Sequence, residues 1–154
     1  MILTVVLMIG WATGQTQPPQ QVPTILFMCP HGAAKSVLAS TYFRELARER
    51  GLNIRVESGG TEPDAQVAPP VAAHLRKQGY DVPALPPQKI TGAQLQRADI
   101  VISMGCDLSD LPSPRGKLLS WDEVPSVSEN LERADEAIRK RVTQLIEELL
   151  QQKK

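Results

Sequence analysis

Apolar residues follow two kinds of spacing along this chain, and the two kinds alternate. Short runs that are continuously apolar, β-branched or strictly alternating predict strands at residues 24–28, 53–57, 100–104 and 117–121. Longer stretches with apolar residues three or four positions apart predict helices at residues 37–50, 69–79, 91–97 and 129–151. Strands and helices therefore take turns through most of the chain.

This alternation predicts an α/β fold: a three-layer sandwich with a four-stranded parallel sheet flanked by helices. The 154 residues, of which 42% are hydrophobic, suit one compact domain with a substantial core. Ligands of parallel sheets bind at the carboxyl ends of the strands. Cys29 directly follows the first predicted strand, so we expect it at such an end.

The N-terminal residues have a different composition from the rest. Residues 2–12 are almost all apolar, small residues follow at positions 12–14, and a polar segment rich in Pro and Gln fills residues 15–22. This order predicts a signal peptide at 1–14, a linker at 15–22 and the folded domain at 23–154. No Lys or Arg precedes the apolar run, so an N-terminal strand or a misassigned start codon stays an alternative.

The location of the protein depends on that leader. If the leader is cleaved, the protein is expected to be secreted or periplasmic, without stable membrane insertion. If the chain is not exported, it is expected to be cytoplasmic. The 17 basic residues balance 17 acidic ones, which argues against a nucleic-acid partner. Only two cysteines, Cys29 and Cys106, are present, so any intramolecular disulfide joins these two.

The segment after the first strand carries the clearest chemical signal. A strand, a tight turn and a helix follow one another, and Ser36 is expected to cap the helix. The backbone N–H groups of such a turn and the positive end of the helix dipole bind oxyanions and stabilise a thiolate. The expected oxyanion-binding residues are Pro30, His31, Gly32, Ala33, Ala34, Lys35 and Ser36, next to the Cys29 thiol.

Four segments together resemble one known family. The stretch Cys29-x-His31-x-x-Ala34-Lys35-Ser36 is similar to the anion loop of the low-molecular-weight protein tyrosine phosphatases and of the related thiol-linked arsenate reductases. The segments at residues 58–63, 98–104 and 121–125 resemble further parts of that family, in the same order. The resemblance covers about residues 24 to 150 and implies the low-molecular-weight phosphatase fold.

The resemblance also implies roles for individual residues. Cys29 would be the nucleophile, Ser36 would support its thiolate, and Lys35 would bind the oxyanion together with the loop amides. An aspartate before a proline serves the family as general acid, but Val124 stands at that position here. Asp122 is therefore the expected catalytic acid and Glu123 the alternative, although both could be ordinary loop carboxylates. Neither a metal nor an organic cofactor is implied.

Two departures from the family lie within the anion loop. Lys35 replaces an arginine, and a lysine offers one mobile charge where an arginine grips a phosphoryl group with a planar fork. Losing one such preorganised contact lowers rates by about 10²- to 10³-fold. Gly32 replaces an asparagine, and glycine adopts the same left-handed turn without strain.

Three functions follow from these residues. The first is hydrolysis of a phosphomonoester, formally protein phosphotyrosine, through a cysteinyl-phosphate on Cys29. The second is reduction of arsenate by Cys29 and Cys106, with Cys106 as resolving thiol and an external thiol as reductant. The third is oxyanion binding without catalysis. Cys106 could equally be a small buried residue. His74, Tyr80 and Trp121 are expected to have structural roles, and Ser128 to cap the last helix.

Overall fold

A computed structural model describes residues 21–152 and contains the predicted parallel sheet. Its strands pair in the order β2-β1-β3-β4, and every neighbouring pair is parallel. The strands are β1 (Thr24–Cys29), β2 (Arg55–Gly60), β3 (Ile100–Ser103) and β4 (Lys117–Ser120). Their carboxyl ends meet at one edge of the sheet, as the alternation of elements predicts.

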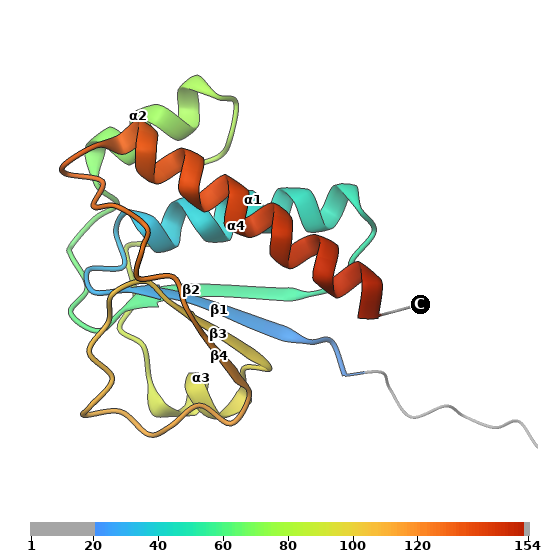
Figure 1. Cartoon of the computed structure of the whole chain (residues 1–154). Helices are drawn as coiled ribbons and strands as arrows, with labels where there is room; N and C mark the ends of the chain where they lie inside the picture. The colour runs from blue at the N-terminus through green and yellow to red at the C-terminus, as the bar shows by residue number, and fades with distance from the viewer. Residues whose placement is uncertain (1–20, 153–154) are drawn as a thin grey trace, which may run out of the picture.

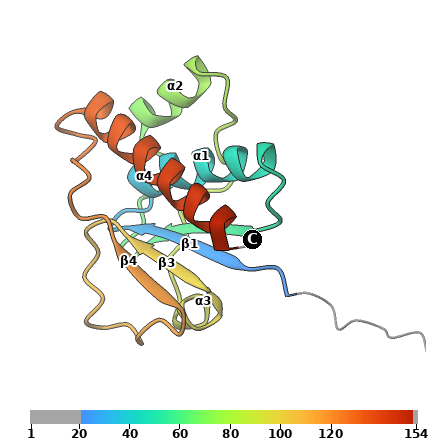
Figure 2. The same ribbon diagram turned by 45° about the vertical axis from the view of Figure 1, so that its right-hand side comes forward.

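Helices cover both faces of this sheet, so the predicted three layers are confirmed. In Figures 1 and 2, α1, α2 and α4 lie on one side of the sheet and α3 lies on the other. The helices are α1 (Lys35–Glu49), α2 (Pro69–Lys77), α3 (Gly92–Arg97) and α4 (Leu131–Gln152). No helix within residues 21–152 is both long and apolar enough to cross a membrane.

Strand β1 is buried on both faces because it lies between the two helical layers. Phe27 and Cys29 belong to the larger core cluster, which α1 and α4 cover. Leu26 and Met28 point the other way into a smaller cluster that includes Leu95 of α3. This explains the continuous apolar run at residues 24–28, since a strand in this position has no polar face.

Several predicted boundaries are wrong, each for a local physical reason. Helix α1 begins at Lys35, and its N-cap residue Ala34 makes no side-chain capping bond, so Ser36 lies inside the helix. The last helix is capped by Asn130, whose side-chain oxygen accepts the amide of Arg133 at 2.9 Å, and not by Ser128. Strand β2 extends to Gly60 because backbone pairing with β1 continues where the side-chain pattern stops.

The leader lies outside the described part of the chain. The predicted signal peptide at residues 1–14 and residues 15–20 of the predicted linker precede the first described residue. The domain boundary near residue 23 therefore stays a prediction, as does the location of the protein.

Candidate active site

The Cys29 side chain lies at the carboxyl end of the central strand, under the first turn of α1. It is 3% exposed. Its Sγ lies 3.2 Å from the hydroxyl oxygen of Ser36, and the Ser36 amide donates to Sγ at 3.5 Å. A Cys29 thiolate at this position would accept hydrogen bonds from both groups. The predicted partnership of Cys29 and Ser36 is thus present in the geometry.

The amino end of α1 offers backbone donors beside this sulfur. The helix has no side-chain cap, and within residues 21–152 the amides of Ala33, Ala34 and Lys35 donate to no other group. Uncapped N–H groups of this kind bind anions. The amide of Gly32, by contrast, donates to the Cys29 carbonyl at 3.2 Å, and Pro30 has no amide hydrogen. The free amides of the loop, which we call the cradle, are those of His31, Ala33, Ala34 and Lys35, because the His31 amide also donates to no other group within residues 21–152.

Glycines on two segments fix the shape of the loop. Gly32 has φ of +60°, and a β-carbon there would lie 2.7 Å from the Gly60 nitrogen. A β-carbon on Gly60 would in turn lie 2.5 Å from the Gly32 nitrogen. The two backbones therefore touch with no room for a side chain. Sequence reasoning recognised the Ser-Gly-Gly segment but did not assign it this supporting role.

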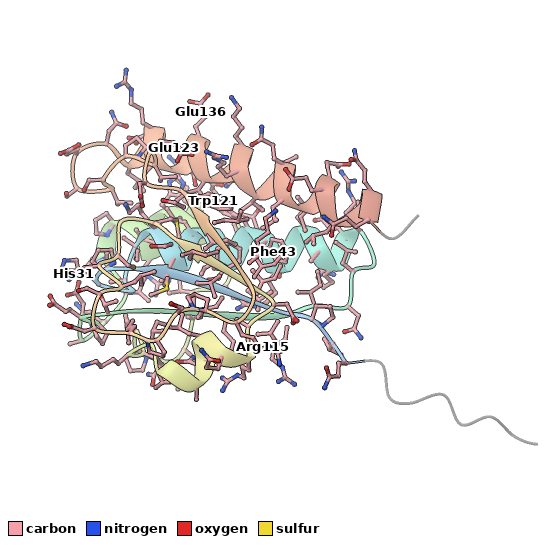
Figure 3. The ribbon with its side chains drawn as sticks, turned by 60° about the horizontal axis from the view of Figure 1, so that its bottom comes forward. His31, Phe43, Arg115, Trp121, Glu123 and Glu136 are labelled. Carbon is pink, nitrogen blue, oxygen red and sulfur yellow. The ribbon has the colours of Figure 1, made fainter. Side chains whose placement is uncertain are left out.

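His31 lies at the rim of the loop. Its side chain is exposed, and its Nδ1 lies 3.4 Å from a carboxylate oxygen of Asp64. The Asp64 amide also donates to the His31 carbonyl at 3.0 Å, and the Glu62 amide to the Pro30 carbonyl at 2.9 Å. Figure 3 shows His31 at one end of β1. The segment after β2 thus braces the anion loop from outside, and sequence reasoning had given no role to Asp64.

Lys35 reaches from the anion loop toward the turn after β3. Its Nζ lies 3.8 Å from where a β-carbon on Gly105 would stand. Gly105 has φ of +85°, a backbone conformation that other residues rarely adopt. The Lys35 ammonium group therefore lies beside this turn, and one positive charge lies between the two loops.

Asp122 holds that same turn. Its carboxylate accepts hydrogen bonds from the Gly105 amide at 2.8 Å and from the Ser120 hydroxyl. The Ser120 bond first, and then the Gly105 bond, hold the pKa of Asp122 below its usual value, and the Lys35 charge adds to this. Asp122 is therefore ionised at neutral pH. The structure brings it near Lys35, but its contacts suit positioning better than proton donation.

Glu123 and Val124 point elsewhere. Glu123 forms an ion pair with Arg141 of α4, and Figure 3 shows it beside that helix. Val124 is 3% exposed and packs in the larger core cluster. Trp121 is buried against Phe27, with ring centroids 5.9 Å apart, as expected for a packing residue. The segment after β4 therefore brings only Asp122 to the site.

Cys106 lies in the turn after β3, within reach of the charges of the site. Burial raises the pKa of its thiol to about 11 against the opposing effect of a hydrogen bond with Ser103. Ser103, three residues before Cys106, pairs across the sheet with Met28, the residue before Cys29. Cys106 packs against the smaller core cluster, whereas Cys29 belongs to the larger one. Both cysteines are free thiols, and Cys106 is half-buried. No group of metal-ligating residues occurs within residues 21–152.

A comparison with protein families points to the same family as the residues of this site. Residues 24–154 match the family described as low molecular weight phosphotyrosine protein phosphatase. The chain belongs to this family, and the predicted resemblance is confirmed.

Individual relatives carry different activities in their names. A protein of Halobacterium salinarum named a putative arsenate reductase is 28% identical over 128 residues, covering 79% of this chain and 89% of its own length. The structure of a thioredoxin-dependent arsenate reductase of Corynebacterium glutamicum is 26% identical, with a TM-score of 0.75 over 88% of this chain. This chain spans only 65% of that structure.

A phosphatase structure is equally close in fold. The low molecular weight phosphotyrosine phosphatase of Vibrio cholerae has a TM-score of 0.74 and 24% identity, covering 84% of this chain and 98% of its own. Members of this family are thus named both as phosphatases and as arsenate reductases, so the family is established while the particular reaction is not.

Proposed function

We propose that this protein reduces arsenate with the Cys29 and Cys106 thiols. The observation that carries this proposal is the position of Cys106, a second thiol three residues beyond Ser103, which pairs across the sheet with Met28, the residue before Cys29. The side chains that bind an oxyanion serve phosphate and arsenate alike. A second thiol near the first can resolve a bond from sulfur by forming a disulfide, a step that arsenate reduction uses and phosphate hydrolysis does not.

The reaction balances with these two thiols. The Cys29 thiolate attacks arsenic(V), a sulfur–arsenic bond forms, and one arsenate oxygen leaves as water after protonation. The Cys106 thiolate then attacks Cys29 Sγ, and the electron pair of the sulfur–arsenic bond passes to arsenic. Arsenite leaves, a Cys29–Cys106 disulfide remains, and an external dithiol restores both thiols. The N–H groups of α1 and the Lys35 ammonium would hold the arsenate oxygens.

The contacts of the two candidate acids, Asp122 and Glu123, support the same choice. Hydrolysis of a phosphomonoester with a poor leaving group needs a general acid, and Asp122 is ionised and doubly hydrogen-bonded. Glu123 is paired with Arg141 of α4. Loss of water from arsenate can use a proton of the oxyanion itself.

Hydrolysis of a phosphomonoester through a cysteinyl-phosphate is the second candidate. The contacts of Cys29 with the Ser36 hydroxyl and amide favour it, because they suit a thiolate attacking phosphorus equally well. Substrates with good leaving groups, such as aryl phosphates, would depend least on the missing acid. Binding of oxyanions without turnover is the outcome expected if neither reaction occurs.

The test follows arsenite release by the full reduced chain with arsenate and a dithiol reductant. Cys29→Ser and Cys106→Ser should both abolish release, and mass spectrometry should detect a Cys29–Cys106 disulfide before reductant is added. Aryl phosphate hydrolysis is followed in parallel. Hydrolysis that Cys106→Ser leaves unchanged, without arsenite from the native chain, would assign the protein to the phosphatases and overturn the proposal.

A further inference from the structure

A second charged hollow lies at the opposite edge of the sheet from Cys29. It has a volume of about 600 Å³ and opens where the strands begin. Its charged and polar lining includes Thr24, Arg55, Gln96, Arg97, Asp99 and Arg115. Thr24 and Cys29 are the two ends of β1, which separates the hollow from the thiol by about 17 Å at 3.3 Å per residue. Figure 3 shows Arg115 beside α3 and His31 at the other end of β1.

Positive charge dominates this hollow although the whole chain is neutral. Arg97 is held by Glu57, with Nη2 2.9 Å from both carboxylate oxygens. Asp99 is the one carboxylate in the lining, and its Oδ2 already accepts the Thr24 amide at 2.8 Å. The side chains of Arg55 and Arg115 form no hydrogen bond or ion pair within residues 21–152. Counting Glu57, three positive charges therefore face two negative ones.

The backbone fixes where the two unpaired arginines stand. Arg55 opens β2, and its amide donates to the Pro23 carbonyl at 2.8 Å. Arg115 precedes Gly116, where a β-carbon would lie 2.2 Å from the Asp99 carbonyl oxygen. The turn at Gly116 therefore tolerates only glycine, and it places Arg115 against the end of α3. The backbone therefore anchors the two arginines at the sheet edge on separate elements.

We propose that this hollow binds a compound carrying two or more linked phosphate groups. Guanidinium groups match phosphate oxygens with paired hydrogen bonds, and arginines from separate elements can each take a different phosphate. The volume falls in the range of small-molecule sites. A single phosphate can take paired hydrogen bonds from one guanidinium, whereas linked phosphates offer a separate group to each of the two free arginines. This site shares no residue with the thiol site and does not depend on the reaction proposed there.

A titration resolved by residue tests the proposal on the full chain. Inorganic triphosphate is added to ¹⁵N-labelled protein at low and at physiological salt, and backbone amide shifts are followed. The amides of Arg55, Arg115 and Gly116 should shift together along one binding curve. Shifts at Ser36 report the thiol site separately and follow their own curve.

Matched variants distinguish a specific binding site from a general effect of positive charge. Replacing both Arg55 and Arg115 by Gln should weaken this curve about a hundredfold, roughly tenfold for each charge-assisted contact. Glu57→Gln frees Arg97 and should tighten binding several-fold. Arg133→Gln removes one positive charge from an exposed position on α4, as each single replacement in the hollow does, and should change nothing. The amide spectra also show whether each variant is folded.

Three results would overturn the proposal. The first is a shift confined to the anion loop, and the second is equal weakening by Arg133→Gln. The third comes from vesicles of anionic phospholipid: binding that needs Arg55 and Arg115, without any response to triphosphate, would assign the hollow to lipid headgroups instead.

Discussion

At the scale of single residues, Lys35 sets the strength of oxyanion binding in the transition state. Lys35→Arg should raise kcat/KM for an aryl phosphate by about tenfold or more, because a fork replaces a single mobile charge. The guanidinium would extend toward the Gly105 turn, which Lys35 Nζ already approaches. Steady-state kinetics check this, with Cys29→Ser as the inactive control. Equal rates for lysine and arginine would show that the loop amides alone hold the anion.

Asp122 is predicted to position the Gly105 turn and not to donate a proton. Because hydrogen bonds from Ser120 and Gly105 lower its pKa, it stays ionised as the pH rises from 5 to 9 and produces no titration there. Asp122→Asn should lower aryl phosphate turnover about three- to tenfold, equally for good and poor leaving groups. Rates across a series of substituted phenyl phosphates measure this, with Glu123→Gln as the control. If the loss of turnover in Asp122→Asn grows with the pKa of the leaving group, Asp122 is the general acid.

Cys106 should make disulfide formation strongly dependent on pH. Its thiol, with a pKa raised to about 11 by burial, is a thiolate in about one molecule in ten thousand at pH 7. The rate of arsenate-driven disulfide formation should therefore rise about tenfold per pH unit between 7 and 9. Acid quench and mass spectrometry follow the disulfide in a single turnover. If the rate does not change with pH, an external thiol resolves the arsenic adduct in place of Cys106.

At the scale of elements, a buried polar cluster joins α1, α2 and α4. Tyr42 is 4% exposed and donates to Asp135, which also contacts His74 at 3.1 Å and Arg139 at 2.9 Å. The Arg139 guanidinium lies over the Tyr42 ring, 3.8 Å from its centroid. His74 therefore has the structural role expected from the sequence, as a partner of a buried carboxylate.

This cluster predicts a stability that falls at both ends of the pH scale. Burial and then the Asp135 bond raise the pKa of Tyr42, so stability is lost as the pH rises above about 10, where the unfolded chain ionises first. Burial acts to raise the pKa of Asp135, but its bonds from Tyr42, Arg139 and His74 outweigh this and lower it. Its contribution is complete above about pH 4 and is lost as the pH falls further.

Tyr42→Phe should lower the free energy of unfolding by about 1 to 2 kcal/mol at neutral pH, because it removes one buried hydrogen bond. The difference from the native chain should shrink above pH 10, since the variant has no phenol to ionise there. Urea titrations at pH 5, 7 and 10.5 measure both effects. Tyr80→Phe keeps the hydrogen bond between Tyr42 and Asp135, so the loss of stability above pH 10 should remain in this variant. An equal loss in both variants would contradict the role given to Asp135.

The elements themselves could be read from the sequence, whereas their ends could not. The apolar run at 24–28 and the periodic apolar positions of α4 identify strand and helix because burial imposes those patterns. The start of α1 at Lys35 is not visible in the sequence, since Ser36 resembles a cap but turns toward Cys29. Likewise, nothing in the sequence shows that Asp122 binds the Gly105 amide, a contact between residues 17 positions apart.

At the scale of the whole molecule, the two core clusters should unfold together. They lie on opposite faces of the sheet but share β1, whose Phe27 belongs to one and Leu26 to the other. Leu95→Ala in the smaller cluster and Ile146→Ala in the larger should each lower the free energy of unfolding by about 2 to 5 kcal/mol. Both should leave the dependence on urea concentration unchanged.

Coincident unfolding curves from circular dichroism and tryptophan fluorescence are the measurement. Leu85→Ala, at a side chain 73% exposed, is the control and should shift the curve little. Separate transitions for the two signals in either core variant would show that the layer containing α3 unfolds independently.

The contact between Gly32 and Gly60 has a consequence for how this protein can change over generations. Neither position accepts a side chain, so a mutation at either glycine disrupts the fold and is removed by selection. The backbone of the anion loop therefore stays unchanged. The side chains that surround the cradle carry no such restriction, and a lysine codon becomes an arginine codon by one nucleotide change. A new reaction can therefore arise at Lys35, Cys106 or Asp122 in single steps, while the framework that binds the oxyanion is inherited unaltered.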